Sequence, residues 1–304
     1  MLPTLFEVGG VAVPAYFVTT TLGYTVGFWW LHRSASKVLA DADGLVGLYM
    51  SLFVSGWLGA RLMHIVGGLG RLSPADILGA FFETGGGVAF LGGVLGGTLG
   101  AVAYMLWTRL PVWKLLDVAA APLLMGLAVG RVGCTLAGCC HGRAMDATVQ
   151  SVLVSLTGGD LVTVDAAPFV AVVYRPMGHG SIFEVPVYPT QLFEVVAAAG
   201  LALGLAWIYR RFRRFDGQVF AMMLAAYGLA RWVGEGMRGD VIRGADHAVM
   251  GASFSTGELS SMVLLGLAAG MVAGRFRGGV GPEPVPSAEP LPVDGVADLS
   301  DLDD

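Results

Sequence analysis

The sequence predicts an all-α polytopic membrane protein with about seven transmembrane helices. Only 13% of the 304 residues are charged and 55% are hydrophobic, whereas about a quarter of the residues in a soluble domain are charged. The mean hydropathy is +0.70. Several apolar stretches also have roughly the 20 residues that a spanning helix needs. They lie at residues 11–31, 44–66, 86–107, 115–137, 191–209, 217–237 and 257–274.

Basic residues gather in every second connection between these predicted spans. They are Arg33 and Lys37, Arg109 and Lys114, RRFRR at 210–214, and Arg275 and Arg277. Because cytoplasmic loops carry an excess of Lys and Arg, these connections are expected inside the cell. The N-terminus is then outside and the C-terminus inside, as an odd number of spans requires. We do not expect a cleaved signal peptide, since Glu7 is the only charge before the first span.

Two segments lie outside the predicted spans. Segment 144–190 has short alternating runs such as LVTVDA and FVAVVYR, which predict a small β-rich cap on the outer face. Segment 276–304 is proline-rich and then acidic, which predicts a disordered cytoplasmic tail. The expected organisation is therefore a transmembrane body over residues 1–275, with the cap inserted in it, followed by the tail.

The third predicted span is rich in glycine. Gly92, Gly96 and Gly100 are spaced by four residues, and Gly93 and Gly97 widen the same helix face. Small residues at this spacing allow two helices to approach closely. Helix packing is the first interpretation of the face, and a lipid groove beside a thin helix is the alternative.

Ionisable side chains within the spans are candidates for function, because they are costly in a membrane. Arg231, Glu235 and Arg238 share one helix face at spacing i, i+4, i+7. The other candidates are Arg61 in the second span, Arg131 in the fourth, and Gln191 and Glu194 at the start of the fifth. All lie toward the outer ends of their spans, so we expect them to converge on one polar pocket that opens to the outer leaflet.

The predicted pocket favours an anion, because its arginines outnumber its glutamates. Arginine stays charged and offers a planar fork of donors that suits phosphate or carboxylate. In a membrane, the available anion is a phospholipid headgroup. The alternative is that the charges form internal salt bridges, for instance Arg231 with Glu235, or reach out to the interface.

The stretch GRVGCTLAGCCHGR, residues 130–143, contains all three cysteines of the chain and His141. A structural zinc site needs four converging ligands, and no second cysteine cluster exists, so the sequence predicts no metal and no other cofactor. A disulfide from Cys134 to Cys139 or Cys140 is open if the helix ends between them. Inert buried thiols are the other interpretation.

Glycines frame the arginines of this stretch, in GRVG at 130–133 and GR at 142–143, and they permit close backbone approach to a ligand. The frame resembles the GR-x-G-N-F-x-N-G-E-x-x-G-R signature of the prolipoprotein diacylglyceryl transferase family. Further resemblances follow in the family's order over residues 10–275. They are Tyr16 in VPAYF, and the motifs GARLMHI, GGVAFLGG, YPTQLFE and ARWVGE.

The resemblance implies a multi-pass enzyme of the bacterial cytoplasmic (inner) membrane with a periplasmic cap. Such an enzyme moves a diacylglyceryl group from phosphatidylglycerol to the lipobox cysteine of a prolipoprotein signal peptide, and glycerol phosphate leaves. Arg131, Arg143 and Arg231 are then expected to stabilise the phosphate, with His141 and Glu235 as candidate bases. The expected substrate-binding residues are Tyr16, Arg61, Gly92, Gly133, Gly142, Gln191, Glu194 and Arg238. No basic patch interleaved with aromatic residues predicts a nucleic-acid partner.

The sequence also departs from the family pattern. Leu91 stands where the family has a third-span histidine, and Tyr188 replaces the histidine of its HPSQ segment. Cys134 and Ala137 replace the signature asparagines, and Cys139 replaces the signature glutamate. We therefore expect retained lipid binding and altered proton handling. The open alternatives are a same-fold transferase with another acceptor or lipid, a non-catalytic protein that binds or transports anionic lipid, and a redox- or metal-sensing membrane protein.

Overall fold

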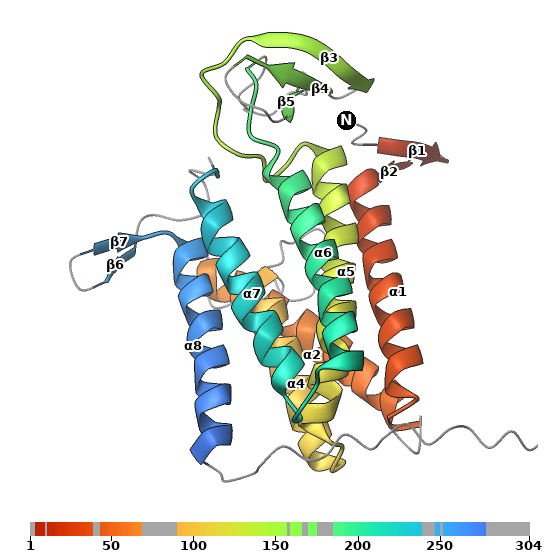
Figure 1. Ribbon diagram of the computed structural model, residues 1–304. Coiled ribbons are helices and arrows are strands. Elements are labelled where there is room, and N and C mark those ends of the chain that lie inside the picture. Colours follow the sequence, from red (N-terminus) through yellow and green to blue (C-terminus); the bar gives the residue numbers. More distant parts are fainter. Residues whose placement is uncertain are drawn as a thin grey trace, which may run out of the picture.

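Seven α-helices dominate the described part of the computed structural model, which covers residues 4–9, 11–38, 43–68, 90–156, 159–165, 170–174, 185–238, 247–249 and 252–277. The helices stand side by side as a bundle (Figure 1). They are α1 (Ala15–Ala35), α2 (Asp43–Gly68), α4 (Phe90–Trp107), α5 (Val112–Ala137), α6 (Thr190–Arg211), α7 (Gln218–Glu235) and α8 (Thr256–Arg277). The predicted helical class is therefore confirmed.

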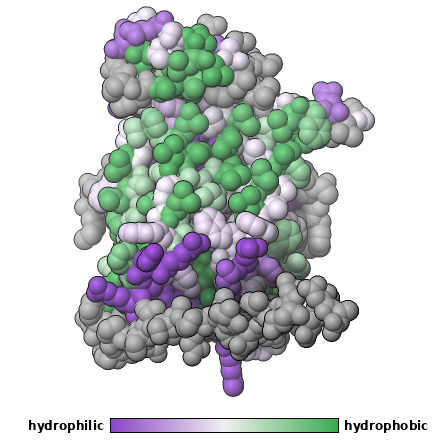
Figure 2. All heavy atoms as spheres, turned by 45° about the vertical axis from the view of Figure 1, so that its right-hand side comes forward, coloured by the Kyte–Doolittle hydropathy of each residue, from purple (hydrophilic) through white to green (hydrophobic). Residues whose placement is uncertain are grey.

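Four of these helices are long and apolar enough to cross a membrane: Gly44–Gly67, Val112–Ala137, Thr190–Arg211 and Thr256–Gly274. Leu91–Trp107 is apolar but shorter. Apolar side chains cover the side of the bundle, and hydrophilic ones gather toward the end away from the β3–β5 sheet (Figure 2). At that end α1 and α6 each finish on basic residues, Arg33 in one and Arg210 and Arg211 in the other.

The helix bounds agree with the predicted spans to within a few residues, with one correction. The predicted first span, 11–31, begins as a strand: β2 (Val11–Pro14) pairs antiparallel with β1 (Thr4–Val8), and α1 starts after Pro14. Because proline restricts the residue before it to extended backbone, the chain stays in a strand up to Pro14 and the helix begins only after it. Residues 86–89 of the predicted third span and the predicted tail beyond Arg277 lie outside the described residues.

The predicted β-rich segment between α5 and α6 forms a three-stranded antiparallel sheet at one end of the bundle (Figure 1). Its strands, in the order β3-β4-β5, are Val149–Leu156, Gly159–Val164 and Val170–Tyr174. Val172 and Val187 exchange backbone hydrogen bonds of 3.1 and 2.9 Å, which tie the sheet to the segment that leads into α6. A second hairpin, β6 (His247–Val249) with β7 (Ala252–Phe254), precedes α8 and was not predicted.

The glycine face of α4 packs directly against α2. A Cβ on Gly96 would lie 2.9 Å from the Cα of Gly59, and a Cβ on Gly92 would lie 2.5 Å from the Cβ of Met63. Both distances are shorter than real Cβ contacts. The packing interpretation of this face is therefore confirmed, and it also accounts for Gly92, which the resemblance assigned to the substrate.

Asp117 sets the depth of α7 relative to α5. It is 1% exposed, and its carboxylate accepts hydrogen bonds of 2.9 Å from the backbone N–H groups of Gly217 and Phe220. Arg131 follows Asp117 by 14 residues, and Arg231 follows Gly217 by the same number. Both helices rise in the same direction (Figure 1), by about 1.5 Å per residue. The two arginines therefore reach similar depth.

We predict that Gly96→Leu destabilises the α2–α4 pair, because the added side chain meets backbone that cannot move aside. Overpacking of this kind costs about 1–3 kcal/mol. A thermal unfolding curve in detergent micelles should shift to lower temperature. Gly200→Leu on α6 is the matched control, since nothing lies within 4 Å of a Cβ at Gly200. Equal stability of the two variants would contradict close α2–α4 packing.

Candidate active site

The signature stretch begins with a tight reversal at the end of α5. Gly138 has a left-handed backbone with φ of +71°, which glycine adopts without a steric penalty. The N–H of Cys139 then donates to the carbonyl oxygen of Cys134 at 3.1 Å. This is the hydrogen bond of a Schellman motif, which folds the chain back over the last helical turn. As a result, Cys139 returns to the level of Cys134.

The following residues are joined by backbone hydrogen bonds to two other parts of the chain. The N–H of Gly142 donates to the carbonyl of Tyr188 at 2.9 Å, and the N–H of Arg143 donates to that of Met237 at 3.0 Å. A Cβ on Gly142 would lie 2.6 Å from the Met237 carbonyl oxygen. The glycine was predicted to admit a ligand. In the structure, protein backbone packs beside it, and its contact with a ligand stays a prediction.

Gly133 has the same role on α5. The space beside it is taken by α1, where a Cβ on Gly133 would lie 3.1 Å from the Cβ of Thr19 and 3.3 Å from the Cα of Tyr16. Tyr16 itself is at the start of α1, with 47% of its surface exposed. Gly133 and Gly142 of the signature therefore allow helices and loops to pack closely together, whereas nothing lies within 4 Å of a Cβ at Gly130.

The first turn of α6 holds the signature stretch from the other side. The hydroxyl of Thr190 donates to the carbonyl of Cys140 at 3.0 Å, and the Nε2 of Gln191 donates to the carbonyl of Cys139 at 2.8 Å. The same Nε2 lies 2.9 Å from the hydroxyl of Tyr174 in the cap. Gln191, predicted to bind substrate, is 1% exposed and connects the loop, the helix and the sheet.

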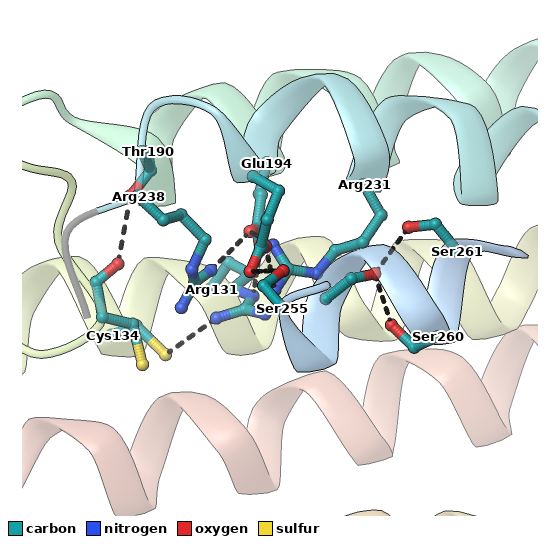
Figure 3. A network of polar contacts seen from close by, with 12 residues as sticks. Arg131, Cys134, Thr190, Glu194, Arg231, Arg238, Ser255, Ser260 and Ser261 are labelled. Atoms are coloured by element: carbon teal, nitrogen blue, oxygen red, sulfur yellow. Dashed lines mark hydrogen bonds and ion pairs between the residues drawn. The ribbon is translucent and has the colours of Figure 1, made fainter. Parts of the chain in front are cut away.

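One turn further along α6, the carboxylate of Glu194 is shared by three arginines (Figure 3). Its Oε2 lies 2.5 Å from the Nε of Arg131 on α5. Its Oε1 lies 2.9 Å from the Nη1 of Arg238, just after α7, and 3.5 Å from the Nη1 of Arg231. Side chains from the fourth, fifth and sixth predicted spans therefore meet at one charged site. That Arg61 of the second span joins them stays a prediction.

A second carboxylate, that of Glu235, extends the cluster toward α8. Its Oε2 pairs with the Nη2 of Arg231 at 2.8 Å, and its Oε1 accepts a hydrogen bond of 2.9 Å from the hydroxyl of Ser255. Ser255 also forms a capping box with Glu258, because its hydroxyl accepts the Glu258 N–H and the Glu258 carboxylate accepts the Ser255 N–H. Sequence analysis missed Ser255, although S-T-G-E before an apolar run is the pattern of such a box.

The Arg–Glu cluster, defined as Arg131, Glu194, Arg231, Glu235 and Arg238, carries three positive and two negative charges. The predicted Arg231–Glu235 salt bridge is therefore present, and among these five side chains the positive charges outnumber the negative ones by one. The five side chains are only 4–17% exposed, so water screens them weakly. This arrangement suits an anion that can take over arginine donors from the glutamates.

Other predicted site residues lie outside these ion pairs. Arg61 is buried on α2, with 3% of its surface exposed. The guanidinium of Arg143 is 5.7 Å from the ring centre of Tyr188, the residue in the place of the family histidine. Leu91 is in the first turn of α4 and is 51% exposed. The ion pairs therefore bring together five of the predicted residues, whereas the substrate-binding roles of Arg61 and Arg143 stay predictions.

His141 is half-buried in the loop after α5, residues 138–143, called the signature loop below, and it contacts the cap. Its Nδ1 lies 2.9 Å from the carbonyl oxygen of Gly142, which can only accept a hydrogen bond, so Nδ1 carries the proton. Its ring packs against Tyr174 at a centroid distance of 5.5 Å. Burial raises the pKa of Tyr174, so this neighbour stays a neutral hydroxyl. The Nε2 of His141 is thus the nitrogen with an acceptor lone pair.

Cys139 cannot replace the family glutamate as a base. Hydrogen bonding of the protonated Cys139 thiol to the sulfur atoms of Cys134 and Cys140 raises the pKa of Cys139, and its partial burial raises it further. The thiol is therefore protonated at neutral pH, whereas a base must offer an unprotonated acceptor. Of the signature residues, His141 is the better proton acceptor.

The apolar bundle and the buried Arg–Glu cluster define a helical membrane protein with a network of buried ion pairs. The sequence profile of the family described as Prolipoprotein diacylglyceryl transferase matches residues 3–273. The chain therefore belongs to the prolipoprotein diacylglyceryl transferase family, whose members are membrane-bound transferases.

Curated relatives carry the family name in more detail. The chain is 26% identical over 241 residues to the phosphatidylglycerol–prolipoprotein diacylglyceryl transferase of Clostridium tetani, covering 79% of this chain and 86% of the relative. It is 26% identical over 280 residues to that of Bacillus licheniformis, covering 91% and 93%. It is 28% identical over 288 residues to that of Chromobacterium violaceum, covering 91% and 97%. The similarity therefore extends over nearly the whole length of these enzymes.

We predict that Glu194→Gln strongly destabilises the protein. The change keeps the shape of the side chain but leaves three largely buried arginines without their shared carboxylate. Breaking a buried ion pair typically costs about 3–5 kcal/mol, and unfolding by denaturant in micelles measures it. Asp216→Asn is the matched control, because Asp216 pairs with a single arginine, Arg213, so that its loss removes the carboxylate of one arginine and not of three. Similar losses in both variants would show that Glu194 does not hold the helices together.

Proposed function

We propose that this protein transfers the diacylglyceryl group of phosphatidylglycerol to the thiol of the lipobox cysteine in a prolipoprotein signal peptide. The thiolate attacks the glycerol carbon that carries the phosphate, a carbon–sulfur bond forms, and the carbon–oxygen bond breaks. Glycerol phosphate leaves with the electron pair. The observation that carries the proposal is the Arg–Glu cluster, in a chain of this family.

The arginines of the cluster are proposed to hold the donor phosphate and to stabilise the charge that grows on it as it leaves. Arg131 and Arg231 approach from different helices, so their guanidinium groups can grip a phosphate from two sides. Glu194 and Glu235 hold these groups in place without lipid, which reduces the reorganisation needed in the reaction. Arg143, exposed at the end of the signature loop, adds a third contact at the entrance.

Thiolate formation is assigned to His141. The lipobox thiol must lose its proton, because the thiolate is the nucleophile. His141 offers Nε2 as an acceptor while its Nδ1 is held by the Gly142 carbonyl. Glu235 is the alternative base, but its carboxylate already accepts from Arg231 and Ser255. The exposed Tyr16 and the buried Arg61 complete the proposed substrate-binding set.

The proposed topology follows from the basic connections and the position of the β3–β5 sheet. The body, residues 1–275, crosses the bacterial cytoplasmic membrane seven times, with the N-terminus and the cap (144–190) periplasmic. The tail, 276–304, is cytoplasmic. This orientation puts the Arg–Glu cluster at the level of the outer leaflet, where the lipid tails remain in the bilayer while the phosphate enters the site.

We expect Arg131→Gln and Arg231→Gln to lower transfer by at least about 100-fold each, the usual cost of losing one charge-stabilising donor. Purified protein is mixed with phosphatidylglycerol vesicles and a peptide with a lipobox cysteine, and mass spectrometry detects the diacylglyceryl thioether. Arg213→Gln, at the opposite end of the bundle, is the control and should retain activity. Unchanged activity in both cluster variants would refute phosphate binding there. A folded wild type that binds the lipid but forms no thioether would indicate another acceptor.

If His141 is the base, His141→Ala should slow transfer by about 100-fold at neutral pH. The defect should shrink as pH rises, because the peptide thiol ionises by itself near pH 8.5. Initial rates from pH 6 to 9.5 for wild type and variant test this. Glu235→Gln is compared in the same series. A ratio of rates that does not change with pH would exclude His141 as the proton acceptor.

A further inference from the structure

The three cysteines of the chain meet at one point, although the sequence spacing did not predict it. The Sγ atoms of Cys134, Cys139 and Cys140 all lie within 4.8 Å of one another. None of the three forms a disulfide. Since these are all the cysteines present, every thiol of the protein belongs to this thiol cluster.

The backbone holds these thiols together from outside the cluster. The left-handed turn at Gly138 returns the chain over α5, and Cys140 also has a left-handed backbone, with φ of +61°. That conformation is strained for a residue with a Cβ, and such strain persists only where the surroundings impose it. Thr190 and Gln191 impose it by binding the carbonyl oxygens of Cys140 and Cys139. The thiols are thus positioned by main-chain contacts and do not depend on one another.

We propose that Cys134, Cys139 and Cys140 form a three-thiolate site for a soft, thiophilic metal ion, best matched by the cuprous ion. Thiolates select soft metals, and the atoms of the three side chains are already close enough to share one ion. The loss of the thiol protons on binding makes the affinity rise with pH. The proposal concerns binding alone and does not depend on diacylglyceryl transfer.

The ligand number favours a three-coordinate ion over zinc. Structural zinc sites take four protein ligands, and in the described residues the group of converging ligand atoms consists of the three cysteines. His141, although next in sequence, turns its Nδ1 to the Gly142 carbonyl and its ring to Tyr174. A site with three thiolates and a monovalent ion carries two negative charges. Arg131, whose Nη1 lies 4.0 Å from the Sγ of Cys134, offsets one of them.

The test uses the full chain, purified in detergent micelles, fully reduced and kept without oxygen. Cuprous ion is titrated in competition with bicinchoninate, a chelator whose cuprous complex is coloured, and uptake by the protein is read from the loss of that colour. We expect one ion per chain. We also expect all three thiols to be protected from maleimide in the metal-bound form, counted by mass spectrometry.

Single variants decide how many cysteines bind the ion. Cys134→Ser, Cys139→Ser and Cys140→Ser should each weaken binding by about 100-fold or more, because even outer-shell changes cost 10–100-fold. The triple variant should bind none, and His141→Ala should bind as the wild type does. No uptake, uptake that persists in the triple variant, or a single cysteine that can be replaced without effect would overturn the proposal. If two of the cysteines remained joined by a disulfide after reduction, so that maleimide labelled only one thiol, the proposal would also be overturned.

Discussion

The carboxylate of Glu194 is the point on which the charged end of the bundle depends. It is the only described partner that Arg131, Arg231 and Arg238 have in common, and these residues come from α5, α7 and the segment after α7. In a poorly screened site, an arginine without its carboxylate is costly. Separation of α6 from α5 or α7 would therefore leave several charges unpaired at once. The ion pairs that hold α5, α6 and α7 together are therefore the same ion pairs that fix the geometry of the proposed anion site.

Polar and small residues hold the other helices together. This is expected in a membrane, because lipid is as apolar as the side chains, and apolar burial between helices gives no hydrophobic driving force. Asp117 binds the start of α7 to α5 and so sets the depth of Arg231. Gly59, Gly92 and Gly96 allow α2 and α4 to touch through their backbones. The Asp117 contacts lie 14 residues before Arg131 on α5, and yet they influence where the side chains of the Arg–Glu cluster meet.

Sequence reasoning predicted what depends on local patterns. Apolar length located the helices, and the i, i+4, i+7 spacing put Arg231, Glu235 and Arg238 on one face. It failed where the partner is distant in sequence. Asp117 was overlooked, because nothing local shows that it will bind a helix start 100 residues later.

The signature glycines were assigned to a ligand for the same reason, since a close approach can be inferred from glycine but its partner cannot. The meeting of the three thiols needed the Schellman turn at Gly138 and the contacts from Thr190 and Gln191. Spacing alone shows none of these.

In the proposed enzyme, the fold of the signature loop allows the residues for proton transfer to differ from the family pattern while the arginines for phosphate binding are kept. Its course depends on main-chain hydrogen bonds to Tyr188, Met237 and the start of α6, and not on the side chains of Cys134 or Cys139. Thiols can therefore stand where the family pattern has an asparagine and a glutamate, without moving Arg131 from Glu194. The arginines that suit a lipid phosphate are anchored by other residues. For this reason, loss of the family's carboxylate and histidines does not imply loss of the proposed donor site, and in our proposal the proton is accepted by His141, which the same loop presents.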